Sequence, residues 1–200
     1  MRQITLPQKC PLFLLVLSSL LLASTCSLLE EGSCQFTRSE VSEWQRGYTY
    51  IFHWDDEYEK LQYIALGAKG VMVQLNDICV DKPLTVSAEL TLSNREDLGL
   101  IYSRAYLLFR HKTGNSFSFL RSVKLAQTSL GGEDIKLEVK NFEYTSLPLL
   151  YPEGIPGSLA FSILIPIDVP CKESDVNTIN EWWLDNFFKS AKITVGYTVR

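Results

Sequence analysis

The chain has 200 residues, of which 46% are hydrophobic and 21% charged, and its 19 Lys and Arg against 23 Asp and Glu give a formal charge of −4. This apolar content excludes a disordered chain, and Ala, Glu and Lys do not dominate as they do in a coiled coil. The acidic balance argues against a nucleic-acid-binding protein, which carries a basic excess, and the length suits one domain.

The first 25 residues have the pattern of a secretory signal peptide. Arg2 and Lys9 precede residues 12–22, which are eleven residues without a charge, and small residues follow at 23–25. This is the order of a basic region, an apolar region and a cleavage site. An uncleaved membrane anchor is the alternative, but a membrane span needs roughly 20 apolar residues. We therefore predict a secreted, extracellular protein with a signal peptide at 1–25, a mature domain at 26–200 and no transmembrane segment.

The strongest pattern along the mature chain is an alternation of apolar and polar residues. Residues 84–93 read LTVSAELTLS and residues 192–199 read KITVGYTV, so both predict strands with one buried and one wet face. The same alternation runs through residues 135–140 and then slips by one position, which predicts a bulge near Asn141. Further strands are predicted at 48–54, 63–75, 101–109, 117–125 and 159–165, and Gly67 and Gly70 predict a bend or a second bulge within the second of these.

One helix is predicted near the C-terminus. Ser174 is a suitable N-cap, and Val176, Ile179, Trp183 and Phe187 then form an apolar stripe over about four turns, flanked by Trp182 and Phe188. The stripe either plugs one end of a barrel or faces a lipid or a partner. The predicted fold is therefore mainly β, a single antiparallel barrel or curled sheet with one amphipathic helix.

Four cysteines remain after cleavage, and in an oxidising compartment they are expected to pair. Cys26, Cys34, Cys79 and Cys171 allow three pairings, and their spacing does not choose among them. The chain has no CxxC motif and only two histidines, so we predict no structural zinc.

Catalytic motifs are absent from the sequence. There is no nucleophile elbow, phosphate-binding loop, dinucleotide motif or HExxH, and neither His53, in a predicted strand, nor His111, after one, has a nucleophile motif beside it. The acidic run at 55–57 lacks the spacing of a calcium loop and is expected at a hairpin tip. We predict no catalytic residues, metal or cofactor, and a protein that is not an enzyme.

Three motifs follow one another between residues 34 and 94. The first is Cys34 followed by a strand that begins with Gly47-Tyr48-Thr49-Tyr50. The second is an aliphatic strand at 70–79 that ends at Cys79, and the third is an alternating strand that ends with Leu90-Thr-Leu-Ser-Asn94. In this order the segment resembles the N-terminal barrel of the large lipid transfer proteins. That family includes vitellogenins, insect apolipophorins, apolipoprotein B and the microsomal triglyceride transfer protein.

The resemblance implies a disulfide and a docking role. Carried over from the family, it pairs Cys34 with Cys79, and it implies a barrel that docks on a lipoprotein receptor or a large lipid-carrier subunit. Full family members continue for many hundreds of residues around their lipid, so this chain is not expected to enclose such a cavity.

Three functions follow from these expectations. The first is a secreted docking module related to lipid transport. The alternatives are a free-standing barrel that carries one small apolar ligand, as lipocalins do, and an extracellular structural protein. For contact with a lipid or a partner, the sequence offers Trp44, Trp182, Trp183 and Phe187.

Overall fold

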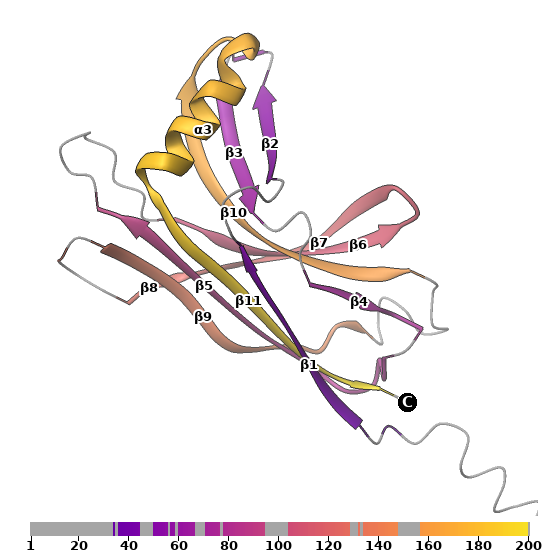
Figure 1. Ribbon diagram of the computed structural model, residues 1–200. Coiled ribbons are helices and arrows are strands. Elements are labelled where there is room, and N and C mark those ends of the chain that lie inside the picture. The colour runs from indigo at the N-terminus through magenta and orange to yellow at the C-terminus, as the bar shows by residue number, and fades with distance from the viewer. Residues whose placement is uncertain are drawn as a thin grey trace, which may run out of the picture.

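The computed structural model of the protein describes residues 34, 36–44, 50–55, 57–58, 60–66, 71–76, 78–94, 104–128, 132, 134–147 and 157–199. The predicted signal peptide and Cys26 lie outside these residues. The described chain is mainly β, with two antiparallel sheets and one short C-terminal helix (Figure 1).

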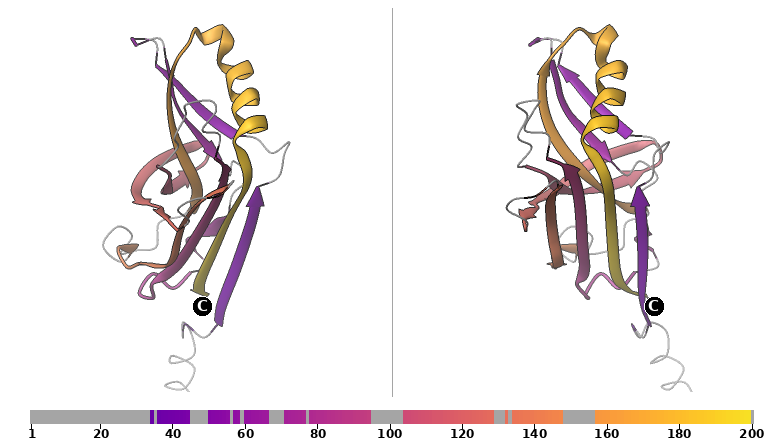
Figure 2. Two further views of the ribbon diagram at one scale, coloured as in Figure 1. Left: turned by 90° about the vertical axis from the view of Figure 1, so that its left-hand side faces the viewer. Right: turned by 60° about the vertical axis from the view of Figure 1, so that its left-hand side comes forward.

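The first sheet, sheet A, has five strands in the order β1-β11-β5-β9-β8. Its strands lie close together along the lower part of the molecule in Figure 2. Their bounds are β1 (Phe36–Trp44), β5 (Leu84–Ser93), β8 (Ala126–Gln127), β9 (Asp134–Tyr144) and β11 (Phe188–Val199).

The second sheet, sheet B, follows the order β2-β3-β10-β6-β7, and β4 pairs with the start of β10. Its strands are β2 (Tyr50–Asp55), β3 (Lys60–Leu66), β4 (Met72–Gln74), β6 (Tyr106–Thr113), β7 (Ser116–Lys124) and β10 (Ser158–Pro170). The strand predicted at 63–75 is found as two strands, because β3 and β4 each pair with a different part of β10. The bend or bulge predicted at Gly67 and Gly70 lies outside the described residues.

Apolar residues from both sheets build one continuous core. The predicted strand at 84–93 is confirmed as β5, whose apolar residues are buried while the residues between them reach the surface. β11 follows the same rule, and from sheet B the core receives apolar residues of β3, β6 and β10. Burying one face of each sheet against the other removes both apolar faces from water, which is the main driving force for this packing.

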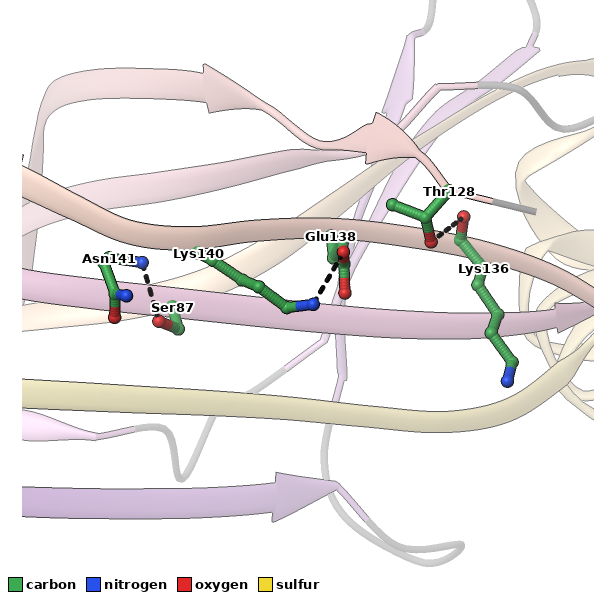
Figure 3. A network of polar contacts seen from close by, with 6 residues as sticks. All are labelled: Ser87, Thr128, Lys136, Glu138, Lys140 and Asn141. Carbon is green, nitrogen blue, oxygen red and sulfur yellow. Dashed lines mark hydrogen bonds and ion pairs between the residues drawn. The ribbon is translucent and has the colours of Figure 1, made fainter.

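The predicted bulge near Asn141 is confirmed. The register between β5 and β9 shifts opposite Ser87, and Asn141 has a positive φ of 49°. The backbone N–H of Asn141 donates a hydrogen bond to the hydroxyl of Ser87 at 3.0 Å (Figure 3). Asparagine adopts this left-handed conformation more readily than most residues, so the sequence supplies a suitable residue where β9 must change the face it buries.

The strand β1 was not predicted, because its sequence does not alternate. Most of its side chains are exposed, and it is held by a nine-residue antiparallel register with β11. Trp44 ends the strand with a buried ring that packs edge-on against Phe188, with 4.1 Å between ring centroids. A strand at the edge of a sheet with both faces in water needs no apolar face, so periodicity does not reveal it.

The predicted helix is present but shorter. A 3₁₀ turn, η2 (Glu173–Asp175), leads into α3 (Val176–Asn186), which lies beside β2 and β3 at one end of the molecule (Figures 1 and 2). The N-cap position belongs to Asp175, and the hydroxyl of Ser174 donates to the Asp175 carboxylate instead, so Ser174 as the cap is wrong. The preceding 3₁₀ turn takes up Ser174 and delays the start of the α-helix.

The described strands form no closed barrel, so a single barrel is not confirmed. Sheet A ends at β1 and β8 and sheet B ends at β2 and β7, and the ladders between described strands do not join these edges. The two sheets meet through side chains in the core. Among the described helices, none has the length and apolar character needed to cross a bilayer.

Candidate functional site

The aromatic residues predicted to contact a lipid or partner are mostly buried. Trp44, Trp183 and Phe187 have 7%, 1% and 0% of their surface exposed, and Trp183 stacks on Phe187 with 6.1 Å between centroids. Trp182, on the outer side of α3, is 44% exposed and meets Phe187 edge-on. Of the four, Trp182 alone is placed to touch another molecule.

The cysteines that the resemblance pairs lie together. Cys34 and Cys79 are at disulfide distance, with their Cα atoms 6.0 Å apart. The backbone N–H of Cys79 donates to the carbonyl of Thr198, and Ile78 bridges to Val199, so the bond ties the start of β1 to a loop fixed against β11. Cys171 is partly buried after β10, and Cys26 lies outside the described residues.

The β6–β7 hairpin carries an exposed apolar face, which the sequence analysis did not predict. In the register, Phe119 lies opposite Arg110 and Phe117 opposite Lys112, while Arg110 is joined through Ala160 of β10 to Met72 of β4. Phe119, Phe117 and Met72 are 64%, 44% and 42% exposed. We call Met72, Arg110, Lys112, Phe117 and Phe119 the hairpin face.

The cations of the hairpin face lie against its aromatic rings. The guanidinium of Arg110 is 4.8 Å from the centroid of the Phe117 ring, and the ammonium of Lys112 is 5.7 Å from the same centroid. The Lys112 ammonium also lies 4.0 Å from the sulfur of Met72. Cations over a ring face are attracted by its quadrupole, so these contacts hold the two charges close to exposed apolar surface.

Arg110 is partly desolvated in this arrangement. Its Nε is buried and has no hydrogen-bond partner among the described residues. Burial lowers the pKa of Arg110 from its ordinary value, and the hydroxyl of Tyr63 opposes this shift in the pKa. Arginine stays charged in proteins even so, and no acid of the described residues forms an ion pair with Arg110.

Basic residues along the hairpin form no ion pair with a described residue. Within the described part of the chain, Arg110, Lys112, Arg121 and Lys124 form no ion pair, and Arg121 lies over the ring of Phe142, 5.1 Å from its centroid. Residues 98–132 contain five Lys and Arg and no Asp or Glu, whereas the rest of the chain has 14 Lys and Arg against 23 acids. This gap in the acidic residues is the sequence signal that marks the hairpin.

A close backbone approach fixes the turn end of the hairpin. Gly157, just before β10, has a φ of +145°, and a Cβ there would lie 2.7 Å from the Nε2 of His111 and 2.8 Å from the carbonyl of Lys112. Only glycine fits both the conformation and the space. His111 is thus a neighbour of this turn, with its Nε2 at 3.4 Å from the hydroxyl of Thr113.

The interior beneath the hairpin is filled by aromatic rings. Phe109 of β6 meets Phe142, Tyr144 and Phe161 at centroid distances of 5.7, 4.9 and 5.4 Å. A surface pocket beside Trp44 has a volume of about 230 Å³ and is lined by charged and polar residues such as Glu43, Glu89 and Lys192. Pockets for small ligands are usually larger and mainly apolar, on the order of 300–1,000 Å³.

No protein-family model matches this chain, and no curated protein or solved structure matches it either. The hairpin face offers rings for apolar contact and unpaired cations for an anionic group, which is the chemistry of binding.

Proposed function

We propose that the protein is a secreted docking module related to lipid transport, which binds the surface of a lipoprotein particle or its receptor and does not act as an enzyme. The observation that carries the proposal is the hairpin face, where exposed phenylalanines lie among cations that form no ion pair with a described residue. Contiguous exposed apolar surface on a soluble protein commonly marks an interaction site. The resemblance of residues 34–94 to the barrel of the lipid transfer proteins supports the same role.

The packing of the described core favours docking over carriage. The rings of Phe109, Tyr144 and Phe161 occupy the space between the sheets that a lipocalin-like carrier would leave for its ligand. A carrier needs a cavity lined by apolar residues, and burying most of the ligand there provides its affinity. The described core instead gains its stability from packing its own side chains.

Lipid extraction followed by particle flotation tests this role. The purified secreted chain is expected to release less than one lipid per molecule into organic solvent, and to float with purified lipoprotein particles in a density gradient. Replacing both rings, Phe117→Ser with Phe119→Ser, is expected to reduce the floating fraction several-fold.

The matched control is Phe36→Ser with Val41→Ser, which removes two exposed apolar side chains from β1 and should leave flotation unchanged. A stoichiometric extracted lipid would instead support the carrier. Flotation that is equally weak in the wild type and in both double variants would contradict the docking role.

A further inference from the structure

We propose that the hairpin face docks on an anionic phospholipid surface, with the rings of Phe117 and Phe119 entering the boundary between headgroups and acyl chains. This inference rests on the proposed docking function and names the chemistry of the surface that is bound. The β6–β7 hairpin extends to one side of the molecule in Figure 1, away from α3.

Charge selects an anionic surface. The 35 residues from 98 to 132 carry five basic residues and no acid, and the remainder of the chain is acidic. An anionic surface therefore attracts the hairpin and repels the rest of the molecule, which fixes one orientation. Basic residues near an anionic leaflet each contribute attraction that falls off within a Debye length, so binding should depend strongly on salt.

The side chains are arranged by depth as a lipid interface requires. Phe117 and Phe119 have no polar group, and they alternate along β7 so that both rings project from the same face. Arg110 and Lys112 lie opposite them on β6, within 5.7 Å of the Phe117 ring centroid. When a ring lies among acyl chains, these cations stay at the level of the phosphates, as long basic side chains do at membrane interfaces.

The state of Arg110 favours a lipid surface over an acidic protein. Its buried Nε cannot join the side-on, two-point contact that arginine makes with a carboxylate through Nε and a terminal nitrogen. It acts instead as a charge held against a ring, and Lys112 is a point charge on a flexible stem. Charges of this kind suit phosphates that move laterally, because no fixed pairing geometry is needed.

Vesicle flotation with the secreted chain tests the proposal. Vesicles of phosphatidylcholine with 30% phosphatidylserine are expected to bind the wild type at least about tenfold more tightly than pure phosphatidylcholine vesicles. Raising NaCl from 0.1 to 1 M, which shortens the Debye length from about 10 Å to about 3 Å, should abolish most of this preference. Lys112→Glu with Phe119→Ser should weaken binding to the anionic vesicles by about tenfold or more.

Two controls separate the hairpin face from general effects. Lys82→Glu with Lys172→Glu changes the net charge at exposed lysines outside the hairpin, and Phe36→Ser removes an exposed ring from β1. Both should retain more than half of the wild-type affinity. The hairpin variant should keep the wild-type unfolding midpoint, because its two side chains lie at the surface.

Three results would overturn the inference. The first is equal binding of the wild type to neutral and anionic vesicles. The second is a loss of vesicle affinity in the control variants that equals the loss in the hairpin variant. The third is that the wild type binds no vesicles, while the hairpin variant disrupts self-association or binding to an acidic protein. If particles are still bound through the hairpin but vesicles are not, the lipid surface is wrong and the docking function stands. If the hairpin variants leave particle binding unchanged, the docking function itself is wrong.

Discussion

The outer surfaces of the two sheets use charge in opposite ways. On sheet A, Lys140 pairs with Glu138 at 2.9 Å, Lys192 with Glu43 at 3.3 Å, and Lys189 with Asp134. Figure 3 shows the first of these pairs beside the bulge of β9. On the hairpin of sheet B, Arg110 and Lys112 lie against the ring of Phe117 instead.

On the surface of sheet A the charges are paired within the protein, whereas on the hairpin the cations are available to bind another molecule. Exposed ion pairs contribute little to stability, typically below about 1 kcal/mol, but they leave no net charge to attract another molecule. Cations over exposed apolar rings contribute a similarly small amount, about 0.5–1 kcal/mol, and keep both kinds of interaction available. Changes to sheet A should therefore alter stability and leave particle binding intact, and changes to the hairpin face should do the reverse.

The largest expected effect on sheet A comes from the disulfide. Cys34–Cys79 closes a loop with a sequence separation of 45, and on the chain-entropy model Cys79→Ser should lower the unfolding free energy by about 4 kcal/mol. Urea unfolding measures this loss, and the yield of secreted protein should fall with it.

Cys34→Ser provides the matched comparison for the disulfide. It should cost as much as Cys79→Ser, and the double variant should cost no more than either. Additive losses would mean that the two thiols stabilise the protein separately, which would contradict the bond.

The bulge of β9 gives the next largest effect. Asn141→Val places a β-branched residue at a φ of 49°, which should reduce the unfolding free energy by about 1–2 kcal/mol. Asn141→Gly should be neutral, because glycine adopts this conformation freely and retains the backbone N–H that bonds to Ser87. Equal unfolding midpoints for the valine and glycine variants would show that the backbone conformation is not the constraint.

The smallest effect concerns pH at the contact between β1 and β11. The hydroxyl of Tyr197 donates to the carboxylate of Glu40 at 2.7 Å. Burial, and then this hydrogen bond, raise the pKa of Tyr197 above its ordinary value of about 10, while Arg38 acts in the opposite direction.

The sign of the pH effect follows from the raised pKa. The unfolded chain loses the Tyr197 proton at a lower pH than the folded chain, so the stabilisation is present below about pH 10 and is lost as the pH rises through the folded pKa. The stability difference between the wild type and Tyr197→Phe should therefore shrink between pH 8 and pH 11, as measured by urea unfolding. A constant difference would show that the Tyr197 pKa is unshifted.

The sequence by itself determined the strands with one buried face. Alternation placed β5, β9 and β11 and located the bulge at Asn141, because each apolar residue on such a strand faces the core. The apolar stripe of α3 was visible for the same reason, with the buried residues Val176, Trp183 and Phe187. The resemblance implied the pairing of Cys34 with Cys79, which the structure places at disulfide distance.

The tertiary structure decided what depends on partners distant in the chain. β1 forms a strand because its backbone pairs with β11. Most of its side chains are exposed, so its sequence does not alternate between apolar and polar residues. Trp182 and Trp183 are adjacent in sequence, and the packing of α3 alone decides that one is exposed and the other buried. The hairpin face forms because three strands bring Met72, Lys112 and Phe119 together. A local sequence pattern does not predict which aromatic rings stay exposed on a folded sheet.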